Sequence, residues 1–354
     1  MTYVGQPVKR IEDARLVTGE GSFVGDIKLP GMLHTAVLRS LHAHALLGPV
    51  DTSAALDLPG VVAVLTGSDV AGVLADVPTR EMDAERSPDE LNAPEQPPLA
   101  RDKVCYVGQP VAIVVAQDPY VAQDALELIK MDYQVLPPVL DPDQATGDDV
   151  PVIHEALGTN VAMRVQLQGG DLDEAFAKAD HVIRQKYQAQ RVAPAPLEAR
   201  GVIAHYQDQG DILTVWNATQ APHRVRHILS RLLGRPEDSI RVIAPDVGGS
   251  FGVKDCIFPE DVLVPYLSVL LGRPVKWIED RQESMLTYHG RGQSIYLEAA
   301  VRHDGVVLGM RVQVVADIGA YFLFTTVSAL QCVPPHCWSL QNSRHQRPAI
   351  GGNY

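Results

Sequence analysis

The hydrophobic pattern changes from continuous to periodic in the first half of the chain. Residues 111–116 form a continuous apolar run, which predicts a buried β-strand. The next stretch places apolar residues at Val121, Ala125 and Ile129, a spacing that predicts an amphipathic helix. Residues 131–137 are strand-like again. Strand, helix and strand in succession indicate an α/β unit.

Two more helices are predicted in the second half. Between residues 222 and 233, apolar side chains such as Val225 and Leu229 follow a helical repeat. Pro259 begins another apolar helical stretch, and Gly272 ends it. Strands are predicted around residues 33–40, 60–66, 181–188, 201–206, 212–216, 240–244 and 275–280, and as a hairpin over 294–320 with its turn at 303–305.

Two polar stretches interrupt these elements. Residues 76–102 are rich in Pro and Glu and predict a long surface loop. Residues 141–160 are rich in Pro, Asp and Gly and predict a domain boundary. The expected organisation is a first domain with an N-terminal extension at 1–140, a linker at 141–160, a second, partial domain at 161–333 and an irregular tail at 334–354.

Composition and charge restrict the class of protein. The 354 residues are 46% hydrophobic and 21% charged, which excludes a disordered chain. The formal net charge of −13 repels phosphate groups, so we expect neither a nucleic-acid nor a membrane partner. No apolar run approaches the roughly 20 residues that cross a bilayer. The N-terminus has no apolar signal core, so we expect a cytoplasmic protein.

Cysteine and histidine give no strong indication of a metal site. The chain has four cysteines: Cys105, Cys256, Cys332 and Cys337. No two of them form a C-x-x-C pair, so we expect no metal–thiolate cluster in this chain. His223 and His227 share one face of a predicted helix, but no third ligand is evident nearby. We expect both histidines to be solvated.

Two groups of charged residues are expected to have structural roles. Glu279, Asp280 and Arg281 follow a predicted strand, and we expect them to form a charge cluster at the surface. Glu198 and Arg200 lie two positions apart in an otherwise apolar stretch. We expect these two residues to form a buried ion pair that braces a loop.

The strongest local signal is the sequence VIAPDVGGSFGVKD at residues 242–255. A predicted strand leads into glycines that let backbone N–H groups approach an anion or an oxo group. The segment lacks the Gly-Lys-Ser/Thr of a P-loop, and Val247 replaces the first glycine of a dinucleotide-binding fingerprint. From the residues alone, a ligand-binding loop and a tight strand-to-helix turn both remain open.

Gln220 comes directly before the predicted helix at 222–233. Its carboxamide can donate to a ligand oxygen without adding charge, although such a residue can equally cap a helix or lie in a loop. The strand at 240–244 should end, and this helix should begin, at the same ligand-facing edge. We therefore expect residues 248–252 to lie within about one side-chain length of the Gln220 amide.

Several segments together resemble one protein family. Residues 106–111 (YVGQPV), 218–223 (ATQAPH) and 241–254 (RVIAPDVGGSFGVK) are similar to the large subunit of the molybdenum hydroxylases. This is the family of xanthine dehydrogenase, aldehyde oxidase and carbon monoxide dehydrogenase. The resemblance runs from about residue 5 to about residue 325. It implies an α+β fold, with an α/β hammerhead domain followed by the first part of a molybdopterin-binding domain.

The resemblance also implies a cofactor and the residues around it. The cofactor would be molybdopterin, with the cytosine dinucleotide as one alternative form, and Gln220 would hydrogen-bond an oxo ligand of the metal. The loop beside the cofactor would consist of Gly249, Ser250, Phe251 and Gly252. Ser250 stands where the family has a third glycine. Asp255 stands where some members have a glutamate that contacts the substrate, so it is a weaker candidate.

Activity and partners follow only from the same resemblance. The family oxidises aldehydes, N-heterocycles or carbon monoxide with oxygen derived from water. Electrons pass to an Fe–S small subunit and an FAD-carrying medium subunit, and the complex is a homodimer of heterotrimers. Neither the Fe–S clusters nor FAD is expected on this chain.

Family large subunits are about twice as long as this chain, and their second half carries the general-base glutamate. We therefore expect no catalytic residue here and no turnover by this chain alone. The alternative is a truncated or frameshifted, catalytically inactive remnant that acts at most as a scaffold.

Overall fold

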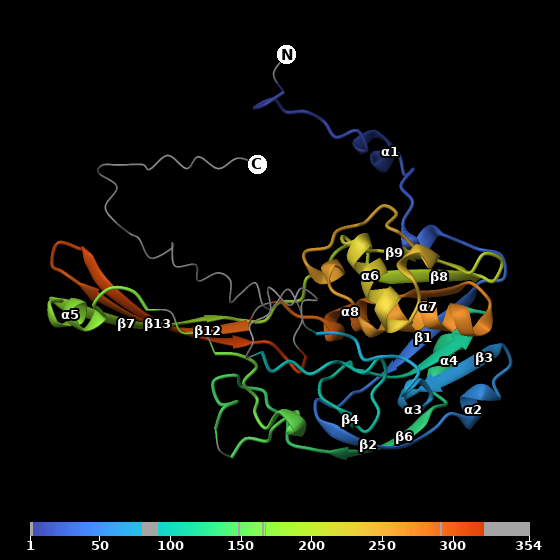
Figure 1. The fold of residues 1–354 in the computed structure, drawn as a ribbon, viewed down its shortest axis with the longest axis horizontal. Helices are drawn as coiled ribbons and strands as arrows, with labels where there is room; N and C mark the ends of the chain where they lie inside the picture. The colour runs from blue at the N-terminus through green and yellow to red at the C-terminus, as the bar shows by residue number, and fades with distance from the viewer. Residues whose placement is uncertain are drawn as a thin grey trace.

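The computed structural model describes residues 3–79, 91–147, 149–164, 166, 168–290 and 292–321. Within these residues the strands form one seven-stranded sheet and two three-stranded sheets. Figure 1 shows the large sheet in the main body, with β7, β12 and β13 extending away from it. The predicted tail at 334–354, Cys332 and Cys337 lie outside the described residues.

The seven-stranded sheet has the strand order β10-β9-β8-β11-β1-β5-β3. Its strands are β1 (Leu33–Arg39), β3 (Val61–Thr66), β5 (Pro110–Ala116), β8 (Gly201–Gln207), β9 (Ile212–Asn217), β10 (Ile240–Ile243) and β11 (Val275–Ile278). In the centre, β1 pairs in parallel with β11, where Leu33 lies opposite Val275, and antiparallel with β5, where Val37 lies opposite Ile113. One continuous sheet therefore contains strands from both predicted domains.

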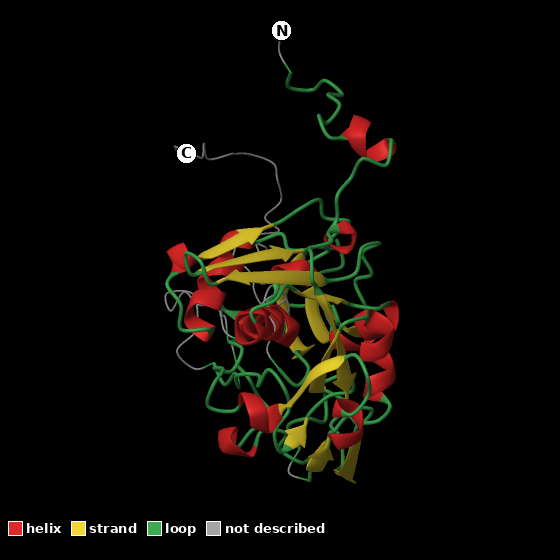
Figure 2. Cartoon of the chain, turned by 90° about the vertical axis from the view of Figure 1, so that its right-hand side faces the viewer, coloured by secondary structure: helices red, strands yellow, loops and turns green. Residues whose placement is uncertain are grey.

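Helices cover both faces of this sheet, as the side view in Figure 2 shows. The longest described helices are α4 (Pro119–Leu126), α6 (Pro222–Leu232) and α7 (Pro259–Leu271). Ile113 of β5 packs in the cluster that contains Leu229 of α6 and Leu263 of α7. Val114, the next residue, packs in the opposite cluster with Ala122 of α4. The apolar run in β5 is continuous because both faces of the strand are buried, which confirms the predicted buried strand.

Shorter elements complete the fold. A small sheet has the order β4-β2-β6. Its strands are β2 (Ala45–Asp51), β4 (Lys103–Val104) and β6 (Lys130–Val135). The remaining helices are α1 (Asp13–Val17), α2 (Ser53–Leu56), α3 (Gly67–Val70), α5 (Leu172–Ala177) and α8 (Arg281–Thr287), with 3₁₀ turns at Val24–Asp26, Glu155–Leu157, Glu237–Ser239 and Val253–Asp255. None of the described helices is both long enough and apolar enough to cross a membrane.

The projecting sheet has the order β13-β12-β7. Its strands are β7 (His181–Ala189), β12 (Gly292–Val301) and β13 (Val307–Asp317). Tyr187 of β7 lies opposite Ile295 of β12, which in turn lies opposite Val314 of β13. Ile183 shares the face of Tyr187, because the two positions differ by an even number, and each of these two side chains is 54% exposed. This face, which we call the apolar sheet face, therefore exposes apolar side chains on β7, whereas Ile295 and Val314 are partly buried.

The hairpin and the helices agree with their predictions, but one predicted loop does not. The turn expected at 303–305 separates β12 from β13, and α6 and α7 fall where the periodicity predicted them. The stretch 76–102 was expected at the surface, yet Val77, Gln96 and Leu99 are buried among its described residues. Val77 and Gln96 also exchange backbone hydrogen bonds of 2.7 and 3.0 Å. The two ends of this stretch pair with each other and pack into the core.

Candidate functional site

The glycine-rich loop follows β10 and precedes α7. Gly249 and Gly252 both have φ of +94°, and Phe251 between them has φ of +53°. Positive φ is uncommon for a bulky residue. The Phe251 ring is also 76% exposed, so packing of the ring does not stabilise this conformation. The contacts of neighbouring residues must hold the backbone here.

Glu198 lies directly behind the loop. The N–H of Gly248 donates to Oε2 of Glu198 over 2.7 Å, and the N–H of Glu198 donates to the carbonyl of Gly248 over 3.2 Å. A Cβ atom at position 248 would lie 2.5 Å from Cβ of Glu198. Real atoms do not approach so closely, so this contact requires glycine.

Lys254 is the second partner of Glu198. Its Nζ lies 2.6 Å from Oε2 of Glu198, and its side chain is 0% exposed. Burial lowers the pKa of the Lys254 ammonium, and its hydrogen bond to Glu198 opposes that shift. The prediction that Glu198 pairs with Arg200 is therefore wrong. The charge that neutralises Glu198 comes from the segment that follows the glycine loop.

Gln220 and the glycine loop meet, as predicted. Oγ of Ser250 donates a hydrogen bond to Oε1 of Gln220. The main-chain N–H of Gln220 donates to the carbonyl of Lys254 over 3.1 Å, and Oγ1 of Thr219 donates to the same carbonyl over 3.0 Å. Lys254 thus links the segments that carry Glu198, Gln220 and Ser250, while the role of Gln220 toward a cofactor stays a prediction.

An N-terminal segment anchors the start of the loop. Nη1 and Nη2 of Arg15, in α1, each lie 2.6 Å from a carboxylate oxygen of Asp246. The N–H of Ser22 donates to the same carboxylate over 2.8 Å. These hydrogen bonds, with Arg15 contributing most, lower the pKa of Asp246 to about 2. Figure 2 shows this segment running from α1 to the body of the fold.

Asp255, the weaker candidate, is already paired. It lies in the 3₁₀ turn Val253–Asp255, and Nη1 of Arg224 in α6 lies 3.2 Å from its Oδ1. The same Nη1 donates to the main-chain carbonyl of Asp255 over 3.2 Å. A contact between Asp255 and a substrate stays a prediction.

A buried chain of alternating charges lies next to these contacts. Arg200 lies 2.6 Å from Glu279 and 3.1 Å from Glu260, and Arg39 lies 2.7 Å from both Glu260 and Glu283. Glu279 was expected at the surface, but it is buried and accepts hydrogen bonds from the Arg200 guanidinium and backbone. The surface prediction is therefore wrong for Glu279, whose partner Arg200 lies 79 positions earlier in the chain, whereas Asp280 and Arg281 are exposed as expected.

The two histidines of α6 lie at the surface. His223 and His227 are both exposed, as expected. Nδ1 of His227 lies 2.6 Å from Oε1 of Glu237. Across the residues that the structure describes, no three His, Cys, Asp or Glu side chains gather closely enough to hold a metal ion.

Several hydrogen-bond donors remain open at the loop. The backbone N–H groups of Gly249, Ser250, Phe251 and Gly252 have no hydrogen-bond acceptor among the described residues. The Nε2 group of Gln220 likewise has none there, whereas its Oε1 is occupied by Ser250. Helix α6 begins at Pro222, and a helix N-terminus favours negative charge. This donor set fits the oxygen-rich head of a molybdopterin cofactor.

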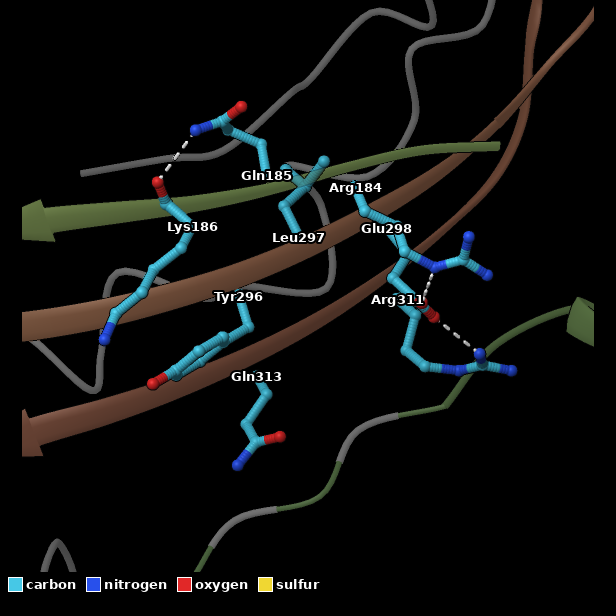
Figure 3. A pocket seen from close by; sticks show the side chains of 8 residues that line it. All are labelled: Arg184, Gln185, Lys186, Tyr296, Leu297, Glu298, Arg311 and Gln313. Carbon is cyan, nitrogen blue, oxygen red and sulfur yellow. Dashed lines mark hydrogen bonds and ion pairs between the residues drawn. The ribbon is translucent and has the colours of Figure 1, made fainter. Parts of the chain in front are cut away.

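A shallow hollow of about 400 Å³ lies elsewhere, on the projecting sheet (Figure 3). Its basic side chains already have partners: Arg184 and Arg311 each lie 2.7 Å from Glu298, and Lys186 lies 2.8 Å from Asp143. The glycine loop does not line this hollow. The candidate site therefore remains at the loop.

Comparison with known families covers most of the chain. The aldehyde oxidase and xanthine dehydrogenase a/b hammerhead domain matches residues 18–137. The molybdopterin cofactor-binding domain matches residues 153–344. These matches confirm the mixed α and β fold, in which a hammerhead domain precedes part of a molybdopterin-binding domain. The domain bounds around 141–160 stay a prediction.

Curated relatives and solved structures agree with these matches. The chain is 40% identical to the nicotine 6-hydroxylase large subunit of Paenarthrobacter nicotinovorans over 330 residues, which is 93% of this chain and 40% of that subunit. It is 28% identical to the nicotinate dehydrogenase large molybdopterin subunit of Eubacterium barkeri, covering 94% of this chain and 76% of that subunit. The crystal structure of quinoline 2-oxidoreductase from Pseudomonas putida 86 matches with a TM-score of 0.81 and 36% identity, over 88% of this chain and 39% of that chain.

The chain thus spans about 40% of the length of the first of these relatives. Its sequence, its fold and its glycine-rich loop all indicate the same family. The chain belongs to the family of large, molybdopterin-binding subunits of the xanthine dehydrogenases, aldehyde oxidases and carbon monoxide dehydrogenases.

Proposed function

We propose that this chain forms one wall of the molybdopterin site of a hydroxylase. The reaction class would be oxidation of an aldehyde, an N-heterocycle or carbon monoxide with oxygen from water. The observation that carries the proposal is the contact between Ser250 and Gln220, which brings two separate family motifs to one donor-lined surface. The relatives named for nicotine and quinoline make an N-heterocycle a candidate substrate, and the equally similar carbon monoxide dehydrogenase large chain keeps carbon monoxide as a candidate.

When bound, molybdopterin supplies the redox chemistry of its metal. The chain's own residues bind and orient it. The N–H groups of Gly249 and Phe251 and the Nε2 of Gln220 donate to oxygen atoms of the cofactor. Glu198 and Lys254 hold the loop in the conformation that exposes these donors.

Turnover requires a general base that these residues do not supply. Each carboxylate beside the loop is already in an ion pair: Glu198 with Lys254, Asp246 with Arg15, and Asp255 with Arg224. A general base must lie within hydrogen-bond reach of the proton that it takes, and these three carboxylates are engaged with cations of the chain. We therefore infer that the base comes from polypeptide beyond the described residues, either as a continuation of the chain or as a separate subunit.

Two observations support a further polypeptide. The apolar sheet face exposes side chains such as Ile183 and Tyr187, and an exposed apolar patch favours a protein contact. This chain covers 76% of the nicotinate dehydrogenase large molybdopterin subunit but 40% of the nicotine 6-hydroxylase large subunit, so related molybdopterin subunits differ in length.

The partners follow from the family. Relatives are named as large subunits or large chains of multi-subunit enzymes. We propose that an Fe–S subunit and an FAD subunit accept electrons from the assembled enzyme, in the cytoplasm and as a homodimer of heterotrimers. The cytosine dinucleotide is proposed as one form of the pterin.

The test is cofactor content. The chain is purified with any copurifying subunits, and its molybdenum and its oxidised, fluorescent pterin are measured. Gln220→Ala should lower both, whereas His223→Ala, an exposed residue of the same helix, should leave them unchanged. Equal content in wild type and Gln220→Ala would contradict the proposed site, and absence of pterin from every preparation would favour a non-catalytic remnant.

A further inference from the structure

Ser250 occupies the centre of a short hydrogen-bond network. Its Oγ accepts a hydrogen bond from the N–H of Lys254 over 3.2 Å and donates one to Oε1 of Gln220. The main-chain N–H of Gln220 donates to the carbonyl of Lys254 over 3.1 Å. Gln220 is therefore held at both its backbone and its side chain by the segment around the loop.

In this network the carboxamide has one orientation, with its Oε1 toward Ser250 and its Nε2 away from it. A hydroxyl has a single proton, and here that proton reaches Oε1 of Gln220. If the carboxamide turned over, its Nε2 group would donate to Ser250 Oγ instead. Both orientations form one hydrogen bond between the two side chains, but in the reverse one Ser250 Oγ would accept from two N–H groups and its own proton would have no acceptor among the described residues.

We propose that Ser250 is a positioning residue, which turns the Nε2 group of Gln220 outward and so selects a ligand atom that accepts hydrogen bonds. The proposal rests on the proposed function, because the ligand atom would be an oxygen of the bound molybdopterin centre. With Nε2 outward, the amide of Gln220 adds donors to the open N–H groups of the loop to which Ser250 belongs. The nearby carboxylates of Glu198 and Asp255 are paired with Lys254 and Arg224, so they do not oppose an oxygen ligand.

The first test observes the hydrogen bond directly. The full chain is labelled with ¹³C and ¹⁵N at glutamine, and the Gln220 signals are assigned by their loss in Gln220→Ala. Ser250→Ala should shift the ¹³Cδ and ¹⁵Nε2 resonances of Gln220, because the bond to Oε1 is lost. Ser250→Thr keeps a hydroxyl and should retain the wild-type shifts. Unchanged Gln220 resonances in Ser250→Ala would overturn the proposal.

The second test measures how firmly the site holds the pterin. Pterin loss on dilution is followed for the chain with its copurifying subunits, and unfolding temperatures identify variants that fold poorly. Ser250→Ala should release pterin about 3- to 10-fold faster than wild type, which corresponds to the loss of one ordinary hydrogen bond. Ser250→Thr should release pterin at the wild-type rate. In the Gln220→Ala background, the additional Ser250→Ala substitution should not change the rate of pterin release further.

Additive effects of the two substitutions would overturn the positioning role, because Ser250 would then act independently of Gln220. Wild type could hold no pterin although Ser250→Ala shifts the Gln220 resonances. That result would overturn the ligand role together with the proposed function and would confirm only the hydrogen bond. The two failures are therefore distinguishable.

Discussion

Nζ of Lys254 lies 2.6 Å from Oε2 of Glu198, and the same carboxylate oxygen accepts the N–H of Gly248. A buried ion pair thus forms the support of the glycine loop. Because Lys254 also contacts Gln220 and Ser250 through its backbone, displacement of its side chain would disturb the whole candidate site.

Replacement of Lys254 by Met should destabilise the chain. The substitution leaves the Glu198 carboxylate without its counter-ion, and breaking a buried pair costs about 3–5 kcal/mol. We expect about 3 kcal/mol, because Glu198 keeps 17% of its side-chain surface exposed. Urea unfolding of the two proteins measures the difference.

The double variant Glu198→Gln with Lys254→Met is the matched control. It removes both charges and keeps a carbonyl acceptor for the N–H of Gly248. It should be more stable than Lys254→Met alone. If the double variant is the less stable of the two, the charge pair is not what supports the loop.

Gly248→Ala should be far more damaging than an alanine at an open glycine. The new Cβ would lie 2.5 Å from Cβ of Glu198, whereas a Cβ at Gly169 meets nothing within 4 Å. We expect a loss of roughly 1–3 kcal/mol for Gly248→Ala, typical of overpacking, and little change for Gly169→Ala. Thermal unfolding of both variants checks this difference, and equal midpoints would contradict the close approach.

Acid should release the N-terminal segment from the loop. The pKa of Asp246 is lowered to about 2 by Arg15 and Ser22, against about 3.9 in an unfolded chain. A lowered pKa means that the ionised carboxylate stabilises the folded contact above about pH 4. This stabilisation is lost as pH falls from about 4 to 2 and the carboxylate is protonated. Hydrogen exchange at the Ser22 amide, corrected for its intrinsic pH dependence, should accelerate over this range.

Asp246→Asn provides the comparison for this experiment. The amide keeps an acceptor for Ser22 but loses the charge that Arg15 requires. Exchange at Ser22 should therefore be faster than in wild type at pH 6 and should not change further between pH 4 and 2. An identical acid response in both proteins would assign the effect to another group.

Arg200→Met should destabilise the centre of the molecule by about 3–5 kcal/mol, because it leaves Glu279 and Glu260 buried without their shared cation. The guanidinium also stacks 3.8 Å above the Phe258 ring, a contact that Met does not replace. Arg302→Met, which breaks only an exposed pair with Asp304, should cost less than about 1 kcal/mol. Denaturant midpoints of the two variants measure the contrast.

Elements with local signals could be predicted from the sequence. The apolar run of β5 and the periodic residues of α6, such as Leu229, follow from their own positions along the chain. The approach of Gln220 to the glycine loop could also be predicted, because a strand end and a helix start had to meet at one edge.

The partners of buried charges could not be predicted. Glu198 and Lys254 are 56 positions apart, and Arg39 and Glu260 are 221 apart. No pattern in one segment specifies a partner in another, so the sequence favours the neighbouring Arg200 as the partner of Glu198. The sequence does show Glu198 as a charged residue in an apolar stretch. This pattern indicates that Glu198 is buried and paired, but it does not identify the cation.

The most direct measurement is turnover by this chain in the absence of any other polypeptide. Dye-coupled oxidation of aldehydes, N-heterocycles and carbon monoxide would be measured on the purified chain, with molybdenum determined in the same sample. We predict no turnover, because the carboxylates beside the loop are all ion-paired and a general base alone contributes about 10²–10⁴ in rate. Stoichiometric molybdenum together with turnover from this single chain would contradict the account.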